Sequence, residues 1–130
     1  MQRTVWLAGL VLLLGPLARA AEVVSPAQLD ERVAIRDVVV HDGTVSGTVV
    51  NTTGRTLEHV KLVIEHQWLW RDEFHPGADS PGRVDYYTLP DAIPPHGQVP
   101  FTYRPSEPLP ERSDGHFVTS VGVASVEEVG

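Results

Sequence analysis

Apolar and polar residues alternate over residues 60–71, and this is the clearest pattern in the chain. One set of alternate positions is apolar apart from a single histidine: Val60, Leu62, Ile64, His66, Trp68 and Trp70. The intervening set includes Lys61, Glu65 and Arg71. Because successive side chains of a strand point to opposite faces, the pattern predicts one long strand whose first set faces the core. A helix is disfavoured, since a period of about 3.6 residues would scatter the charged side chains into the apolar stripe.

Five further segments rich in β-branched and aromatic residues predict strands at residues 32–41, 44–51, 83–89, 98–104 and 116–126. Residues 22–29 contain Pro26 and show no sustained period, so we expect a leader that adds at most a short edge strand. Asp42 and Gly43 predict a type I′ hairpin turn between the first two strands. Pro100 cannot donate to a ladder, which places its strand at a sheet edge or at a bulge.

These elements, with no helical stretch between them, predict an all-β fold, an immunoglobulin-like antiparallel β-sandwich of six or seven strands. We expect a single domain over residues 21–130. The apolar positions of the predicted strands give the expected core: Val45, Val49, Val60, Leu62, Ile64, Trp68, Val99, Phe101, Val121 and Val123. In the turn after residue 51, we expect Asn51 to cap its own backbone and Gly54 to be left-handed.

The first twenty residues have the features of an export signal. Arg3 supplies the positive start, residues 5–14 the apolar segment, and Ala18-Arg19-Ala20 a small-x-small cleavage site. Cleavage after Ala20 removes two of the 10 basic residues and none of the 17 acidic ones, which leaves a formal charge of −9. The export signal predicts a periplasmic or secreted protein. Because an acidic surface repels phosphate groups, we expect the protein not to bind nucleic acid. No later run of about 18 apolar residues occurs, so we expect no membrane span in the mature chain.

The chain contains no cysteine. This composition excludes disulfides, a thiolate nucleophile, thiolate metal ligands and a lipid anchor attached to an N-terminal cysteine. The domain must therefore be held together by core packing and strand pairing.

Three segments in order resemble a known family: residues 47–54 (GTVVNTTG), 60–64 (VKLVI) and 93–101 (IPPHGQVPF). Together they are similar to the FxLYD-type domains and related immunoglobulin-like modules of exported bacterial envelope proteins. The tetrapeptide that names the family is absent, and an acidic, aromatic loop replaces the short turn that usually follows the long strand. The resemblance implies an exported module that supports binding or assembly, and it implies no catalytic residues.

The end of the long strand and the loop at residues 72–82 carry the richest set of candidate binding residues. The proposed surface consists of Trp70, Asp72, Glu73, Phe74, His75 and Asp79. Exposed aromatic residues flanked by charge are typical of recognition patches. The alternative is that Trp68 and Trp70 both fill the core and the loop is merely solvated. We expect the surface to bind another envelope or secreted protein, without a cofactor.

Zinc or copper binding is the alternative function. His66 shares a face with the tryptophans, and His75 lies in the following loop among carboxylates, a combination that suits these metals. The spacing matches no recognised ligand signature, and the other histidines are scattered singly along the chain.

Catalysis is not expected. Asp72 with Glu73, and Glu127 with Glu128, are carboxylate pairs, but adjacent residues of an extended chain point in opposite directions. The chain also lacks the nucleophile elbow of the serine hydrolases.

Overall fold

The computed structural model describes residues 22–25 and 28–130. The predicted export signal lies outside these residues, so its cleavage stays a prediction. The described elements, in chain order, are β1 (Glu22–Val23), α1 (Leu29–Arg32), β2 (Val33–His41), β3 (Thr44–Asn51), β4 (Thr56–Trp70), β5 (Arg83–Thr88), β6 (Gln98–Tyr103) and β7 (Gly115–Val129). None of the helices in this part of the chain has the length and apolar character needed to cross a membrane.

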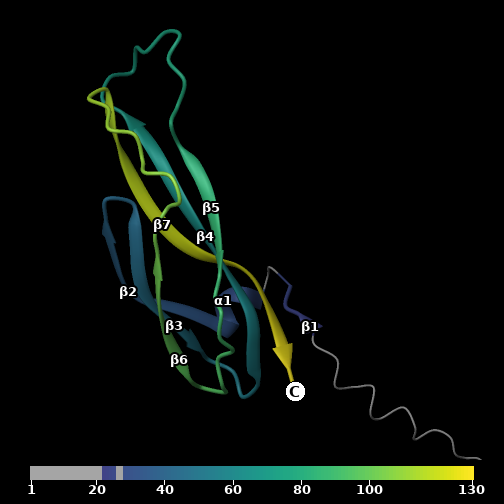
Figure 1. Cartoon of the computed structure of the whole chain (residues 1–130). Coiled ribbons are helices and arrows are strands. Elements are labelled where there is room, and N and C mark those ends of the chain that lie inside the picture. The colour runs from purple at the N-terminus through teal and green to yellow at the C-terminus, as the bar shows by residue number, and fades with distance from the viewer. Residues whose placement is uncertain (1–21, 26–27) are drawn as a thin grey trace, which may run out of the picture.

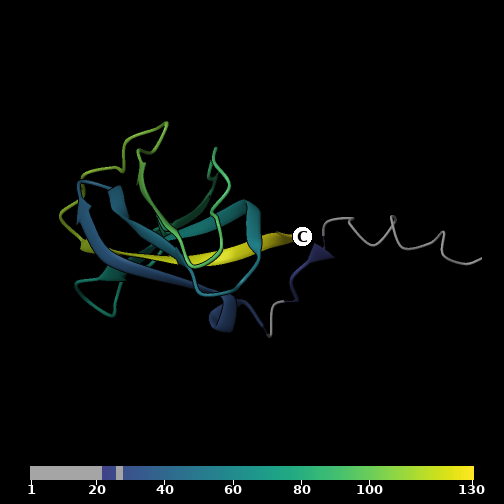
Figure 2. The same ribbon diagram turned by 90° about the horizontal axis from the view of Figure 1, so that it is seen from below.

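The strands form two antiparallel sheets, with the orders β1-β7-β4-β5 and β2-β3-β6. The predicted all-β sandwich is thus confirmed. β3 and β4 follow one another in the chain but lie in different sheets. β6 pairs with β3, and β7 pairs with β4. Strands B and E, and strands C and F, pair in the same way in immunoglobulin-like sandwiches. Figure 1 shows that β4 and β7 continue past the end of the second sheet as a distal arm, and Figure 2 shows the C-terminal end of β7 beside β1.

Several local predictions hold. Asp42 and Gly43 both have positive φ, 50° and 83°, as a type I′ turn requires. The strand that contains Pro100 is at the edge of its sheet. In the described part of the leader the strand is limited to the two residues of β1, which pair with the end of β7.

Three details differ from the sequence prediction. The long strand begins at Thr56 and ends at Trp70, because an irregularity around His59, whose φ is 51°, lets the ladder with β7 continue beyond it. The last strand extends to Val129. The four-residue helix α1 was not predicted; it places Leu29 in the core and leads to Arg32, whose guanidinium pairs with buried Glu128.

The turn after β3 is organised by Asn51, as predicted. Its Oδ1 accepts a hydrogen bond from the Thr53 backbone N–H at 2.8 Å, and its Nδ2 donates to the carbonyls of Arg55, Ile93 and Pro94. The expectation that Gly54 is left-handed is wrong, since Gly54 is not among the positive-φ residues. The side chains of Asn51 and Thr53 satisfy this turn's backbone groups, so a left-handed glycine is not needed.

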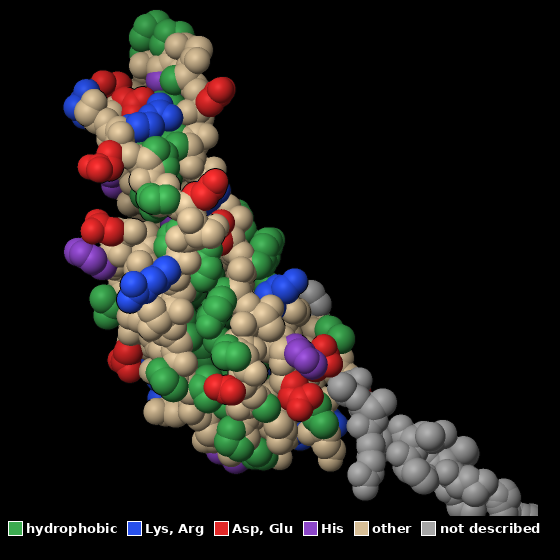
Figure 3. All heavy atoms as spheres, viewed as in Figure 1, with side chains coloured by type: hydrophobic (Ala, Val, Ile, Leu, Met, Phe, Trp, Pro, Cys, Tyr) green, Lys and Arg blue, Asp and Glu red, His purple; other side chains and the backbone are tan. Residues whose placement is uncertain are grey.

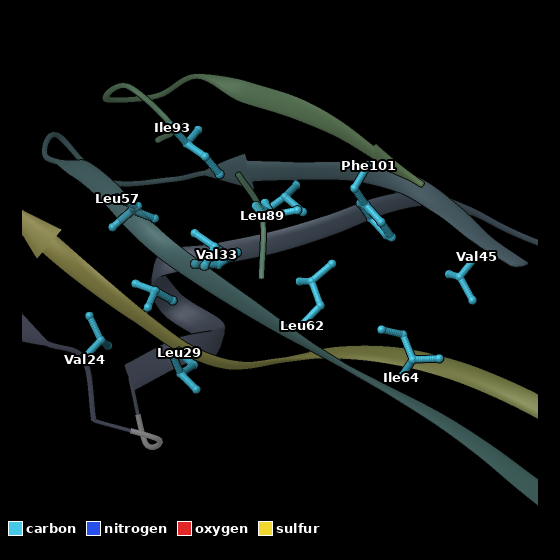
Figure 4. Packing of buried hydrophobic residues seen from close by; sticks show 13 residues of the cluster. Val24, Leu29, Val33, Val45, Leu57, Leu62, Ile64, Leu89, Ile93 and Phe101 are labelled. Carbon is cyan, nitrogen blue, oxygen red and sulfur yellow. The ribbon is translucent and has the colours of Figure 1, made fainter. Parts of the chain in front are cut away.

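The core lies between the two sheets (Figure 4). Seven of the ten predicted core residues are buried, and Val99, Val121 and Val123 are partly buried and pack against the core. The sequence missed several core residues from the ends of strands and from connections: Val24, Leu29, Val33, Leu57, Leu89, Ile93 and Val126. Ile93 is fully buried and pairs as an isolated bridge with Leu57, which anchors the connection between β5 and β6 to the sandwich.

Candidate functional site

The distal arm is built from the far ends of β4 and β7 and from the two loops at residues 71–82 and 104–114 (Figure 1). In the register of the ladder, Trp68 lies opposite Phe117, and Trp70 lies opposite Gly115. Cross-strand pairs of this kind place their side chains on the same face of a sheet. The alternation that buries Leu62 and Ile64 therefore continues into the arm and directs both tryptophans to the inner face.

Four rings pack together inside the arm. Trp68 meets Phe117 with ring centroids 4.8 Å apart and meets Trp70 at 6.0 Å, both edge-on. His75 reaches back from the loop and stacks on Trp70, with centroids 4.0 Å apart and the ring planes 9° from parallel. Trp68 is buried and Trp70 is half-buried. The aromatic side chains thus join the loop to the strand end.

Arg112, in the second loop, holds the two loops together. Its guanidinium carbon lies 5.2 Å from the ring centroid of Trp68 and 5.4 Å from that of Trp70, within cation–π range. The same group binds both carboxylate oxygens of Asp114 and donates to the backbone carbonyl of Asp79 at 3.0 Å. The hydrogen bond from Arg112 is the main reason that the pKa of Asp114 is lowered.

The predicted binding residues therefore occupy two kinds of position. Trp70 is half-buried within the cluster, and Asp72, Glu73, His75 and Asp79 are exposed on the loop. Phe74 is 84% exposed, the largest exposure among the large hydrophobic residues described. Figure 3 shows hydrophobic side chains at the far end of the arm and carboxylates just below it.

Beneath the aromatic cluster, the arm contains a polar network around His66. This side chain is fully buried; its Nδ1 lies 2.9 Å from Thr119 Oγ1, and its Nε2 lies 3.3 Å from Asp85 Oδ2. Asp85 also accepts a hydrogen bond from the Tyr103 hydroxyl and pairs with Arg83. Burial lowers the pKa of His66, and the nearby carboxylate of Asp85 opposes this effect only in part.

The sequence placed His66 on the inner face but did not identify its partners. Thr119, Asp85 and Tyr103 come from three other strands, and their meeting depends on the register of two ladders and on the packing of the second sheet. The only signal in the sequence is that a histidine on an otherwise apolar face needs polar partners.

The two histidines of the alternative metal site have separate environments. His66 contacts Thr119 and Asp85, whereas His75 stacks on Trp70. Residues 22–25 and 28–130 contain no group of three or more histidines and carboxylates placed to hold a metal ion.

Two further groups of side chains are candidates for catalysis, and their positions bear on that interpretation. Glu127 lies near exposed His59, while Glu128 is buried against Arg32 and Arg55, so this pair of carboxylates points to opposite sides of β7. Thr119, His66 and Asp85 have the composition of a nucleophile relay. However, Thr119 lines a hollow together with Asp42 and Glu111, and negative charge in that hollow would disfavour an oxyanion developing at Thr119.

No known protein family, curated protein or solved structure matches the chain.

Proposed function

We propose that the protein is an exported, non-catalytic module that binds another envelope or secreted protein. The proposed contact is the distal surface, consisting of Trp70, Asp72, Glu73, Phe74, His75 and Asp79. One observation carries the proposal. The large aromatic side chain of Phe74 is almost fully exposed, and it lies on a loop that is held in place by contacts of His75 and Asp79. Exposed aromatics on a preorganised support are typical interface anchors, since little conformational entropy is lost on binding.

Two contacts keep the loop in one conformation, and they explain why it can present a preformed binding surface. His75 follows Phe74 directly and is stacked on Trp70, and Asp79 is held through its carbonyl by Arg112. A loop of this length in a small sandwich has either a function or no fixed structure, and these contacts favour the first.

Charge indicates the kind of partner. The chain has a formal charge of −7, and the loop itself carries Asp72, Glu73 and Asp79. A partner with a basic surface would be attracted at long range, and association should slow as the salt concentration rises.

Photo-crosslinking tests the proposal. A photoreactive phenylalanine analogue is placed at Phe74 and, in a separate protein, at Tyr86, which is 60% exposed on the outer face of β5. We expect the probe at residue 74 to crosslink one defined protein in the native envelope, and the probe at residue 86 to give no such product.

The crosslinked protein is then purified and titrated with matched alanine variants. Phe74→Ala should weaken its binding about tenfold or more, as is usual for an aromatic anchor, while Tyr86→Ala should bind like the unchanged protein. Equal binding by the two variants, or a crosslinking pattern that is the same at both positions, would contradict the proposal.

A further inference from the structure

Three outer strands of the sandwich carry features that oppose pairing with another chain. β2 is interrupted by a bulge between Arg36 and Val39, where Asp37 has a φ of 55°. β6 contains Pro100, and β5 is short with Arg83 and Asp85 directed inward. Bulges, prolines and inward charges are the usual means by which sheet edges avoid unwanted pairing.

β7 is different. Its side facing away from β4 is paired with β1 only at Glu127 and Glu128, with one further bond from the Val24 N–H to the Val126 carbonyl. In the part of the chain that the structure describes, no strand pairs with this side between Gly115 and Val123. Residues 117–126 (FVTSVGVASV) contain no charge and no proline. We call the side of residues 115–123 that faces away from β4 the β7 edge.

The backbone groups of this edge belong to alternate residues. The Arg71 N–H donates to the Asp114 carbonyl at 2.9 Å, so the backbone of Asp114 faces β4. Because backbone direction alternates along a strand, the N–H and C=O groups of Phe117, Thr119 and Val121 face the open side. They are positioned to receive an added strand.

A hollow of about 560 Å³ lies beside two of these residues, Phe117 and Thr119. Phe117 and Thr119 form one wall, and Val40 and Leu109 contribute apolar surface from β2 and the second loop. Asp42 and Glu111 also line it, and none of the described residues that line it is a lysine or arginine. Inward-facing side chains of a strand added to the β7 edge would enter a hollow that offers both apolar side chains and two acidic residues.

We propose that the β7 edge binds, as an added strand, an extended segment of another protein that carries a lysine or arginine between β-branched or apolar residues. The main-chain bonds would provide affinity, and the basic side chain would pair with Asp42 and Glu111. A second copy of this chain fits the site less well, because its own residues 117–126 contain no basic side chain. The β7 edge is separate from the distal surface, so this inference does not depend on the proposed function.

A synthetic peptide tests the inference with the purified protein. The probe has nine residues with blocked ends, valine at its odd positions except for a central lysine, and threonine at its even positions. We expect it to slow amide hydrogen exchange of Phe117, Thr119 and Val121 about tenfold or more at saturation. A peptide with glutamate in place of the lysine should bind about fivefold or more weakly.

Two controls test the main-chain bonds. Methylating alternate backbone nitrogens of the probe should abolish the slowed exchange without any change to the protein. Val121→Pro removes an N–H that faces the open side, so it should weaken binding of the lysine peptide. Circular dichroism checks that this variant is folded.

The inference would be overturned by unchanged exchange at millimolar lysine peptide, or by equal binding of the methylated peptide. Equal binding of the glutamate peptide would overturn the assignment of a basic segment. A dimer in sedimentation equilibrium that Val121→Pro dissociates would show that a second copy occupies the edge instead.

Discussion

Asn51 and His66 are two polar side chains buried in this cysteine-free sandwich, and they differ in how fully their polar atoms are hydrogen-bonded. Asn51 joins the turn after β3 to the connection that precedes β6, 42 residues further along the chain. His66 is surrounded by polar partners within the distal arm. Both are fully buried, but only Asn51 has all its polar atoms hydrogen-bonded, since Nε2 of His66 makes no hydrogen bond and only lies near the carboxylate of Asp85.

The first prediction concerns Asn51. Asn51→Asp keeps the shape of the side chain but replaces the donor that serves three carbonyls with a buried negative charge. We expect the free energy of unfolding to fall by about 3 kcal/mol or more. Chemical denaturation measures this loss, and Asp42→Asn, the reverse exchange at an exposed turn, should change stability by less than about 0.5 kcal/mol. Equal effects of the two variants would show that the contacts of Asn51 contribute little.

The second prediction concerns pH. Burial holds the pKa of His66 below its ordinary value of 6.5, so the unfolded chain takes up a proton more readily than the folded one. Stability from this group is therefore present above pH 6.5 and is lost as the pH falls below it. The urea midpoint of the unchanged protein should decrease between pH 7.5 and pH 5.5.

His66→Gln should reduce the size of this decrease, whatever its effect on stability at pH 7.5. The matched variant His116→Gln, at an exposed position of the same arm, should keep the full decrease. If all three proteins lose the same stability, the pH dependence arises elsewhere.

At the scale of elements, the distal arm depends on a close approach between β4 and β7. A Cβ atom at Gly115 would clash with the Leu69 carbonyl oxygen and would lie 2.6 Å from ring atoms of Trp68. At Gly122, in the same strand, the nearest atom would be 3.6 Å away, an ordinary contact. Gly115 therefore allows Trp68 to lie over the backbone of the neighbouring strand.

The third prediction follows from this contrast. Gly115→Ala should destabilise the protein by about 1–3 kcal/mol through overpacking and should alter the near-ultraviolet circular dichroism of the tryptophans. Gly122→Ala should leave that spectrum unchanged. A spectrum of Gly115→Ala identical to that of the unchanged protein would mean that the tryptophan cluster does not require the close approach.

The strands were largely predictable from the sequence, whereas their cross-strand partners were not. Alternation is a local property, so residues 60–70 revealed both the strand and its inner face, including buried His66. Its pairing with Thr119, 53 residues away, depends on register, which alternation does not determine. Ile93 was missed for a related reason, since it lies in a proline-rich connection with no periodic neighbours.

The same limit applies to the candidate site. The sequence identified Trp70, Phe74 and His75 from composition and loop length. It gave no indication that Arg112 and Asp114, more than thirty residues later, complete the cluster. A single arginine in a polar loop has no distinguishing pattern, and only the return of β7 alongside β4 brings it to the tryptophans.

At the scale of the whole molecule, the fourth prediction concerns export. If residues 1–20 are an export signal, the mature protein should begin at Ala21 when it is recovered from a secreting host. Mass spectrometry of the intact protein measures this, and Ala20→Arg should block the cleavage by removing the small residue at the site. Recovery of the unchanged protein with Met1 still present would contradict the prediction.

The pairing at the ends of the described chain also determines how the sandwich responds to mechanical tension. Glu22 lies opposite Glu128, and Val129 lies opposite Thr56, so both ends of the fold are held by the last pairs of antiparallel ladders. Hydrogen bonds in such ladders run perpendicular to the strands. A force that pulls Glu22 away from Val129 would load these hydrogen bonds one at a time from the end of the ladder. It would not load all of them together in shear. The fold should therefore open progressively from these ends under low force, with the distal arm among the last parts to separate.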